Sequence, residues 1–311
     1  MDFLKETNGS KLYNFHSHTE FCDGRATMEA FAREAVRCGF THYGFSPHSP
    51  IPIESPCNMH ADKVSRYLAE VERIKASYAD RVKFYASMEV DYLRGAFGPS
   101  HSVIQKLPLD YVIGSVHFVP TRDGRFVDCD GRYETFRRRL HDYFHDDIRY
   151  VVETFFASTI EMIEGGGFDI IGHFDKIGLN ASYYQPGIEQ EPWYRALTAD
   201  VIDAISAHNA AYPGRPITVE INTKAYADHN GRIFPSPELW GQLRRAGIPL
   251  IVNSDAHVPA LINASRFIAM EMLEQELAGA AEPVGTTEPV GTAEPVGNLT
   301  GNDTFPFFAC L

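Results

Sequence analysis

The chain has 311 residues, of which 44% are hydrophobic and 22% charged, and its formal net charge is −13 at pH 7, so it can bury one large α/β core or at most two. The acidic balance argues against a broad nucleic-acid-binding face, which needs clustered Lys and Arg, and no apolar run is long enough to cross a membrane. The five cysteines are odd in number and show no CxxC spacing, and the first residues lack the basic and apolar regions of a signal peptide, so we expect free thiols in a cytoplasmic protein.

Strand-like runs alternate with helical runs along the chain. The predicted strands are Leu12–Phe15, Thr41–Phe45, Val82–Val90, Tyr111–Val116, Phe168–Gly172, Ile217–Ile221 and Pro249–Val252. The predicted helices are Thr27–Cys38, Ala61–Tyr78, Asp142–Glu164, Tyr194–Asn209, Ser236–Ala246 and a last one from Ala264 to about Ala278. This order implies parallel strands with right-handed crossovers, hence an α/β barrel or an open doubly wound sheet.

The end of the chain has a different composition. A hexapeptide, Ala281-Glu-Pro-Val-Gly-Thr, recurs with small changes from Thr287 and from Ala293. Pro and Gly every six residues cannot build a packed element, so we predict a folded domain over residues 1–280 and a disordered low-complexity tail over 281–311. The alternative is a docking segment that ends in Phe305-Pro306-Phe307-Phe308.

Two histidines follow the first predicted strand. His16 and His18 are two residues apart, so in an extended strand their imidazoles project to the same side, while Phe15 and Ser17 face away. A strand can present a metal ion in this way. The pair alone is weak evidence, because nearby histidines are often unrelated.

His, Asp and Glu also follow the later strands. The strand ends carry Asp23 in the first loop, His48, Glu89, His117, His173 with Asp175, and Asp255 with His257. Asp255 and His257 repeat the two-residue spacing, and a carboxylate that follows apolar residues, as Glu89 does, needs a partner when it is buried. Active sites of α/β barrels lie at the carboxyl ends of the strands, so the pattern predicts a site with several metal ions.

The motifs that contain these residues resemble those of the PHP superfamily and, within it, the histidinol-phosphate phosphatases. They are Phe15-His16-Ser17-His18, Asp23-Gly24, Ser46-Pro47-His48, Glu89, Gly114-Ser115-Val116-His117, Gly172-His173 and Ser254-Asp255-Ala256-His257. The resemblance covers about residues 10–262. It implies a distorted (β/α)7 TIM-like barrel with a trinuclear metal centre.

The resemblance also implies which residues hold each ion. His16, His18, Glu89 and Asp255 would hold the first, Glu89 with His117 and His173 the second, and Asp23, His48 and His257 the third. Many members of the superfamily have His where this chain has Asp23, whereas the histidinol-phosphatase branch resembles it in using Asp. Imidazole and carboxylate ligands suit Zn, Mn or Fe, and the spacing does not choose among them.

Three divalent ions and three carboxylates leave a positive site, which favours a small phosphate ester as substrate. The expected reaction is in-line attack on phosphorus by metal-activated water, without a protein nucleophile. Asp175 and Asp255 are candidate proton donors to the leaving alkoxide, and Lys176, Lys224 and Arg232 are candidate phosphate ligands. A run of three arginines, Arg137 to Arg139, is interpreted as a solvated helix face.

The leading hypothesis is hydrolysis of L-histidinol phosphate in histidine biosynthesis. A PHP phosphoesterase acting on another small phosphate ester or a nucleotide is the first alternative, and a barrel amidohydrolase the second. An amidohydrolase usually needs a bridging Lys on its fourth strand, where this chain has His117. No nucleic-acid or membrane partner is expected, and the sequence leaves the oligomeric state open.

Overall fold

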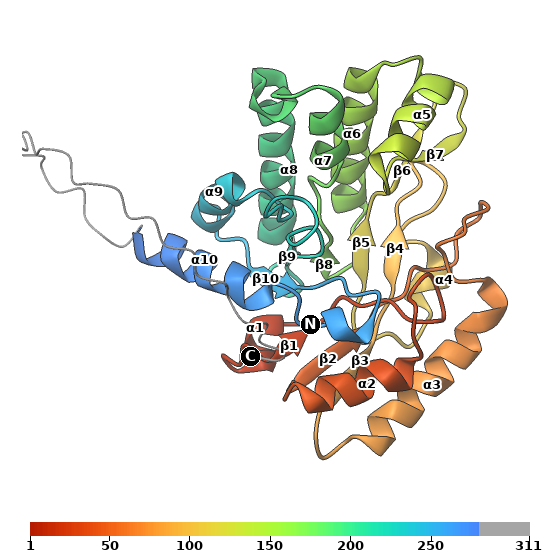
Figure 1. Cartoon of the computed structure of the whole chain (residues 1–311), viewed down its shortest axis with the longest axis vertical. Helices are drawn as coiled ribbons and strands as arrows, with labels where there is room; N and C mark the ends of the chain where they lie inside the picture. Colours follow the sequence, from red (N-terminus) through yellow and green to blue (C-terminus); the bar gives the residue numbers. More distant parts are fainter. Residues whose placement is uncertain (280–311) are drawn as a thin grey trace, which may run out of the picture.

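The computed structural model of the protein describes residues 1–279, and the predicted tail over 281–311 lies outside them. Eight short strands of this part run parallel to their neighbours (Figure 1). They are β1 (Tyr13–Asn14), β2 (His42–Phe45), β3 (Lys83–Ala86), β4 (Glu89–Asp91), β5 (Ile113–Ser115), β8 (Ile170–Ile171), β9 (Thr218–Asn222) and β10 (Leu250–Asn253). An antiparallel hairpin, β6 (Phe118–Pro120) and β7 (Phe126–Asp128), follows β5.

The parallel strands form two sheets, ordered β1-β2-β3 and β10-β9-β8-β5-β4. At one junction a bridge pairs Ser17 with Ala256, and the amide of His18 donates to the Ala256 carbonyl at 2.9 Å. At the other, β3 and β4 follow each other along one run of chain, which pairs with β2 in its first half and with β5 in its second. The sheets together make the distorted (β/α)7 TIM-like barrel expected from the sequence.

The change of partner divides the predicted strand Val82–Val90. The amide of Ser87 still donates to the Phe45 carbonyl, at 2.9 Å, whereas the Met88 carbonyl accepts from the amide of Ile113 at 3.0 Å. The prediction of one uniform strand is therefore wrong. The bend between β3 and β4 leaves Glu89 at the start of the second half.

Helices cover the outside of the barrel (Figure 1). The α-helices are α1 (Phe3–Thr7), α2 (Met28–Arg37), α3 (Val64–Ser77), α4 (Ser102–Gln105), α5 (Tyr133–Phe144), α6 (Ile148–Gly165), α7 (Ile177–Tyr184), α8 (Pro192–Ala211), α9 (Trp240–Arg245) and α10 (Arg266–Gly279), and short 3-10 turns span Ala61–Lys63, Ile188–Gln190, Pro237–Leu239 and Pro259–Leu261. Between residues 1 and 279, no helix combines the length and the apolar character needed to cross a membrane.

The predicted helix Asp142–Glu164 is confirmed over α6 but begins too early, because Asp142 to Phe144 belong to α5, a helix that the sequence analysis did not predict. His145 and Asp146 between them have φ angles of 54° and 63°, in the left-handed region that interrupts a right-handed helix. Asp147 then caps α6, and its Oδ1 accepts from the amide of Tyr150 at 3.0 Å. The predicted helix therefore ran across this break into the last residues of α5.

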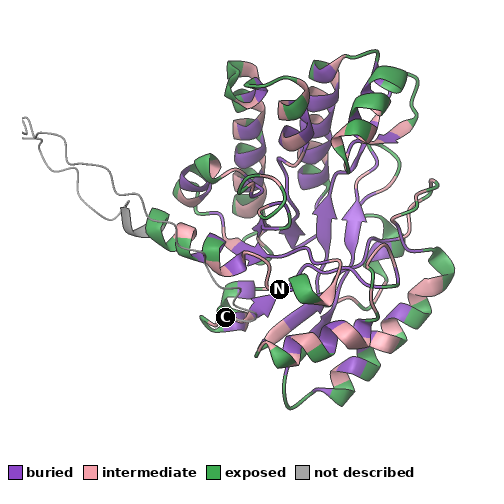
Figure 2. Ribbon diagram, in the orientation of Figure 1, coloured by how far each residue is buried: buried purple, intermediate pink, exposed green. Residues whose placement is uncertain are grey.

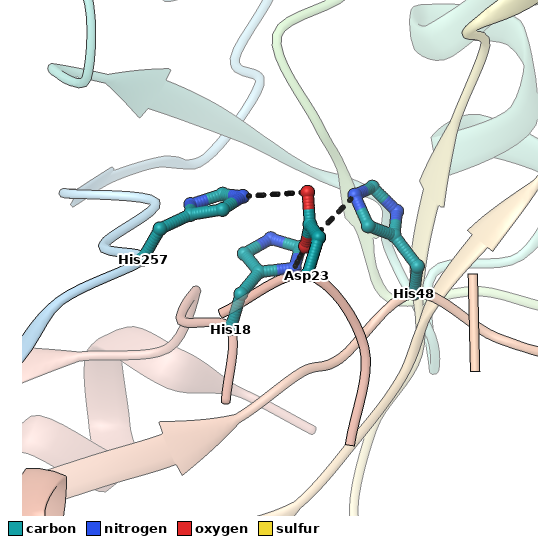
Figure 3. A group of neighbouring side chains, drawn as sticks. All are labelled: His18, Asp23, His48 and His257. Carbon is teal, nitrogen blue, oxygen red and sulfur yellow. Dashed lines mark ion pairs between the residues drawn. The ribbon is translucent and has the colours of Figure 1, made fainter. Parts of the chain in front are cut away.

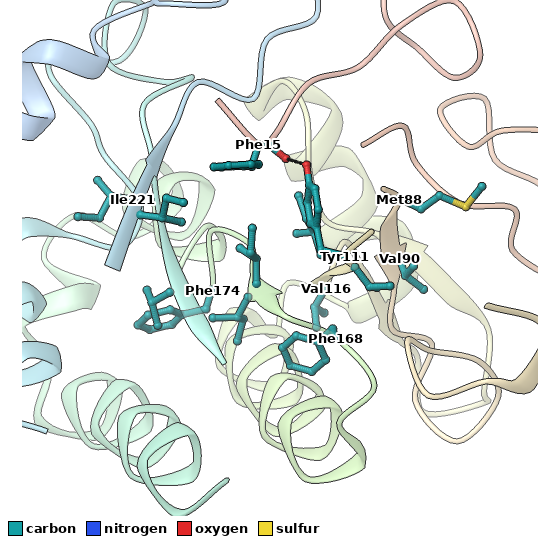
Figure 4. Close-up of a cluster of buried hydrophobic side chains, with 14 of the residues drawn as sticks. Phe15, Met88, Val90, Tyr111, Val116, Phe168, Phe174 and Ile221 are labelled. Carbon is teal, nitrogen blue, oxygen red and sulfur yellow. Dashed lines mark hydrogen bonds between the residues drawn. The ribbon is translucent and has the colours of Figure 1, made fainter. Parts of the chain in front are cut away.

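Aromatic and aliphatic side chains pack together in the core of the barrel (Figure 4). The parallel strands are buried except at the first residues of β2, β3 and β10, while the outer faces of the helices are exposed (Figure 2). The Tyr111 hydroxyl donates to the Phe15 carbonyl at 2.5 Å, and the ring of Phe3 on α1 lies edge-on to both rings, at centroid distances of 5.0 and 5.4 Å. Helix α1, which the sequence analysis did not predict, therefore packs into the core below the ends of the first strands.

A fully buried arginine connects the first and last strands of the barrel. Arg266, the first residue of α10, donates to the carbonyls of Val252 in β10 and of Lys11 before β1, each at 3.3 Å. Its guanidinium lies 5.0 Å from the ring centroid of Tyr13. Burial lowers the pKa of Arg266 to about 10. Arg266 thus fastens α10 to the first and last strands.

Candidate metal centre

The first strand delivers two buried imidazoles to one point, as the two-residue spacing predicted. His16 and His18 are both fully buried, and their Nε2 atoms lie 3.1 Å apart. Oδ1 of Asp255, from the end of β10, lies 3.1 Å from Nε2 of His18. Asp255 has a φ of 49°, an uncommon conformation for a residue with a side chain, and its backbone is therefore held in place by its surroundings.

Glu89 lies at the centre of the histidines. Its two carboxylate oxygens are within 3.6 Å of five imidazole nitrogens: His16 at 3.2 Å, His18 at 3.4 Å, His48 at 3.1 Å, His173 at 3.0 Å and His117 at 3.6 Å. Burial opposes ionisation of Glu89, but the neighbouring His16 and His48 hold its pKa well below the usual range. Glu89 is therefore ionised, and its carboxylate contacts several imidazoles that could bind the same metal ions.

Asp23 lies among three imidazoles, those of His18 and His48 and one further histidine, His257 (Figure 3). The carboxylate lies 3.3 Å from His257, 3.6 Å from His18 and 3.9 Å from His48. Oδ1 of Asp23 and Nδ1 of His48 are buried without a hydrogen-bond partner. Nδ1 of His48 is directed at Glu89, 3.1 Å from its Oε2, whereas Nε2 is directed at Asp23. Buried polar atoms without hydrogen-bond partners beside other imidazole and carboxylate donors fit the coordination of a cation.

The structure thus brings together all nine residues predicted as metal ligands. Three groups of donor atoms lie close enough to share an ion: His18, Asp23, His48 and His257; His16, His18 and Asp255; and His48, Glu89 and His117. His173 reaches the centre through Glu89, at 3.0 Å. Imidazole and carboxylate donors in close groups are the coordination chemistry of divalent transition metals, so this centre fits divalent metal ions.

Two carboxylates that the sequence analysis did not assign to the site support the imidazoles from behind. Glu220 Oε1 accepts from Nδ1 of His16 at 2.7 Å, and Asp91 Oδ1 accepts from Nδ1 of His117 at 2.6 Å. Such partners fix the orientation and tautomer of a metal-binding imidazole. Burial opposes the charged form of His117, but Asp91 raises its pKa to about 9. The available sequence signal was weak: Asp91 lies two residues after Glu89, and Glu220 lies inside a strand.

A cavity of about 460 Å³ opens over this centre. Two of the predicted phosphate ligands, Lys176 and Lys224, line it, together with Asp128 and Asp130 from the end of the β6–β7 hairpin. Lys176 Nζ lies 2.6 Å from Asp130, and Lys224 Nζ lies 3.4 Å from Oδ1 of Asp255. Ammonium groups therefore flank the metal-binding side chains on the cavity wall.

Arg232 and Asp175 do not line the cavity. Arg232 instead makes a bidentate pair with Glu189, at 2.9 and 2.6 Å, and Asp175 accepts from the amide of Ser236 at 2.7 Å. The structure does not bring these residues to the cavity wall; Arg232 is bound by the carboxylate of Glu189 and Asp175 by the amide of Ser236. Burial opposes ionisation of Asp255, but Lys224 and His16 hold its pKa well below the usual range, an unfavourable property for a proton donor.

The remaining sequence predictions concern residues near the site. Cys22 Sγ lies 3.4 Å from Nδ1 of His18, Cys57 lines the cavity, and both carry free thiols. Arg137 and Arg138 are exposed on α5, as expected for a solvated face. Arg139 does not fit this expectation, because its Nη1 lies 2.9 Å from the carboxylate of Asp128 at the end of the hairpin.

Comparison with known proteins relates the chain to one family. A model described as the PHP domain matches residues 14–224. A protein of Deinococcus radiodurans named a probable histidinol-phosphatase is 26% identical over 254 residues, which cover 80% of this chain and 87% of that protein. The histidinol-phosphatase of Bacillus subtilis is 24% identical over 269 residues, covering 78% and 92%.

A solved structure shares the fold. The histidinol phosphate phosphatase of Lactococcus lactis, in complex with zinc, L-histidinol and phosphate, matches with a TM-score of 0.63 and 19% identity. The match covers 86% of this chain and 94% of that one. At this identity the likeness concerns the arrangement of the barrel rather than the chemistry of individual side chains.

Proposed function

Since the chain belongs to the PHP domain family, we propose that it is a histidinol-phosphatase, which hydrolyses L-histidinol phosphate to L-histidinol and phosphate in histidine biosynthesis. The observation that carries the proposal is the convergence of nine His, Asp and Glu side chains beneath a cavity flanked by Lys176 and Lys224. The relatives named histidinol-phosphatase support the choice of substrate.

The nine side chains would hold three divalent ions, which we take to be Zn, Mn or Fe from the imidazole and carboxylate donors. Divalent ions bound there supply Lewis acidity toward the phosphoryl oxygens and lower the pKa of the attacking water. Glu89, which contacts five imidazoles, is the residue we assign to more than one ion. Glu220 and Asp91 keep His16 and His117 in the orientation that directs Nε2 into the centre.

The lysines bind and orient the phosphate ester. Lys224 Nζ lies 3.4 Å from Oδ1 of Asp255 and 3.3 Å from Nε2 of His257, so an ester placed over the centre contacts its ammonium group. Lys176 also lines the cavity, and its Nζ lies 2.6 Å from the carboxylate of Asp130. Burial opposes protonation of Lys176, but Asp130 raises its pKa above the usual range, so its charge persists. Two fixed positive groups favour a dianionic substrate.

We place the enzyme in the cytoplasm, and the free thiols of Cys22, Cys57 and Cys129 support a reducing compartment.

The test is phosphate release by the purified, metal-replete protein from L-histidinol phosphate, compared with an adenosine nucleotide and an aryl phosphate. The proposal expects kcat/KM for L-histidinol phosphate to exceed the others by orders of magnitude. A His48→Ala variant should lose activity, whereas Arg94→Met should retain it, because Arg94 pairs with Glu161 and does not line the cavity. Equal, weak release from all three esters would contradict the proposed substrate and favour a phosphoesterase of other specificity.

A further inference from the structure

We propose that Arg232 is a positioning residue: paired with Glu189, it holds the loop 223–235 so that Lys224 points into the cavity. The inference rests on the proposed function for the identity of the substrate. It concerns a residue that the sequence analysis had assigned to direct phosphate binding, and it replaces that role with a different one.

The pair is a strong interaction in a mostly buried place. Nη1 and Nη2 of Arg232 donate to the two carboxylate oxygens of Glu189 at 2.9 and 2.6 Å, and each side chain is only 17% exposed. The Ser182 hydroxyl also donates to Glu189, at 2.7 Å. Parallel charge-assisted hydrogen bonds fix both the distance and the angle of a guanidinium. Arg232 is therefore anchored to the turn Ile188–Gln190 and to α7.

The Arg232–Glu189 pair packs tightly against α7. A Cβ atom on Gly178 of α7 would lie 2.5 Å from Oε1 of Glu189 and 2.9 Å from Nη2 of Arg232. Only glycine at this position lets the pair pack directly against the helix. Helix α7 begins immediately after Lys176, and Arg232 belongs to the loop that carries Lys224, so the pair joins the two chain segments that carry the cavity lysines.

The loop transmits the position of Arg232 to Lys224. At its base, the amide of Asn222 donates to the Phe234 carbonyl at 2.6 Å, and the amide of Phe234 donates back at 3.1 Å. Within it, the amide of Arg232 donates to the His229 carbonyl at 3.0 Å, and the amide of His229 donates to that of Ala225, the residue after Lys224, at 2.9 Å. Displacement of Arg232 therefore loosens the segment that begins with Lys224.

Direct phosphate binding by Arg232 predicts a different dependence on Glu189. If Arg232 served the phosphate, Glu189 would compete for its guanidinium, and removal of the Glu189 charge would leave phosphate binding unchanged or tighter. If Arg232 positions the loop, removal of either partner has the same effect. The two roles therefore differ in the sign of the Glu189 effect.

The experiment is a double-mutant cycle on the metal-replete protein with Arg232→Met, Glu189→Gln and the combined variant. We expect each single variant to raise KM for L-histidinol phosphate about tenfold, with a smaller change in kcat, and the combined variant to add little. Binding of inorganic phosphate, measured by calorimetry, should weaken by a similar factor. Amide hydrogen exchange within 223–235 should accelerate in all three variants.

The matched control is the exposed pair Arg94 and Glu161, whose variants Arg94→Met and Glu161→Gln should change none of these readouts. Arg232→Lys, which keeps the charge but loses the bidentate geometry, should give intermediate values and remains informative if Arg232→Met does not fold. Normal or tighter phosphate binding in Glu189→Gln overturns the inference. Exchange and inorganic phosphate binding decide it even if the wild-type protein does not hydrolyse L-histidinol phosphate.

Discussion

Replacement of Glu220 by Gln tests whether the hydrogen bond from His16 to Glu220 stabilises the metal centre. Each oxygen of the Glu220 carboxylate accepts hydrogen bonds from two groups. Oε1 accepts from Nδ1 of His16 at 2.7 Å and from Nδ2 of Asn253 at 3.1 Å, and Oε2 accepts from the amide of His173 at 3.3 Å and from Nδ2 of Asn222 at 3.0 Å. A glutamine amide NH2 therefore faces donors whichever way it is turned.

The two asparagines cannot turn to compensate without a loss elsewhere. Oδ1 of Asn253 accepts from the amide of Phe15 at 2.8 Å, and Oδ1 of Asn222 accepts from the amide of Lys224 at 3.1 Å. Two buried donors thus lose their acceptor in Glu220→Gln, at about 1–3 kcal/mol each, so we expect the free energy of unfolding to fall by about 2–6 kcal/mol. Loss of a carboxylate behind a metal-binding histidine lowers metal affinity about 10–100-fold.

The assay combines a denaturant titration of the metal-free protein with metal affinity from chelator competition. Asp169→Asn is the control for a purely structural loss, because Asp169 is a buried carboxylate that binds Arg215 at the opposite ends of the strands. We expect Asp169→Asn to lower stability and leave metal affinity unchanged. The reasoning about Glu220 is refuted if Glu220→Gln folds normally and binds metal as the wild type does.

Three further predictions follow from individual side chains. Glu89→Gln should lower metal content and activity together, and wild-type metal occupancy in this variant would contradict a bridging role for Glu89. Burial opposes ionisation of Glu29, but Arg73 lowers its pKa to about 2, below the unfolded value of 4.5. Its contribution, about 1–2 kcal/mol after solvent screening, should therefore be complete above about pH 4.5 and disappear toward pH 2. Denaturant titrations of wild type and Glu29→Gln should therefore give free energies of unfolding that converge as the pH falls from 4.5 to 2. A difference that stays constant over this range would contradict the prediction. Arg266→Met should lower the free energy of unfolding by about 2–4 kcal/mol, since the carbonyls of Val252 and Lys11 lose their charged donor; an unchanged denaturation midpoint would count against it.

The parallel α/β fold was predictable because strand and helix periods alternate along the chain. The two-residue spacing placed His16 with His18 and Asp255 with His257 on common faces, and strand ends in a barrel converge. The division of the third strand was not predictable, since its cause is a change of neighbouring strand, from β2 to β5, that the residues of the strand itself do not reveal. The break at His145 depends on two left-handed residues within an otherwise helical pattern.

The carboxylates that support the centre were harder to predict than its imidazoles. Glu220 lies inside a strand, where a single sequence does not tell whether a Glu faces solvent or a buried histidine. The partner of Arg232 was likewise not predictable from the sequence, because Glu189 is 43 residues away in the chain. Local spacing predicts which side chains leave a strand together, but it carries no information on partners from other segments.

The position of Arg266 bears on the order in which the protein is completed during synthesis. All nine side chains of the centre lie before it in the chain, the last being His257. Yet the first and last strands are fastened to each other by a guanidinium that belongs to α10. A nascent chain that has released only its first 262 residues from the ribosome therefore carries every ligand without this fastening. The segment that carries every ligand is therefore shorter than the segment in which Arg266 joins the first and last strands, and truncated variants of the protein should keep α10.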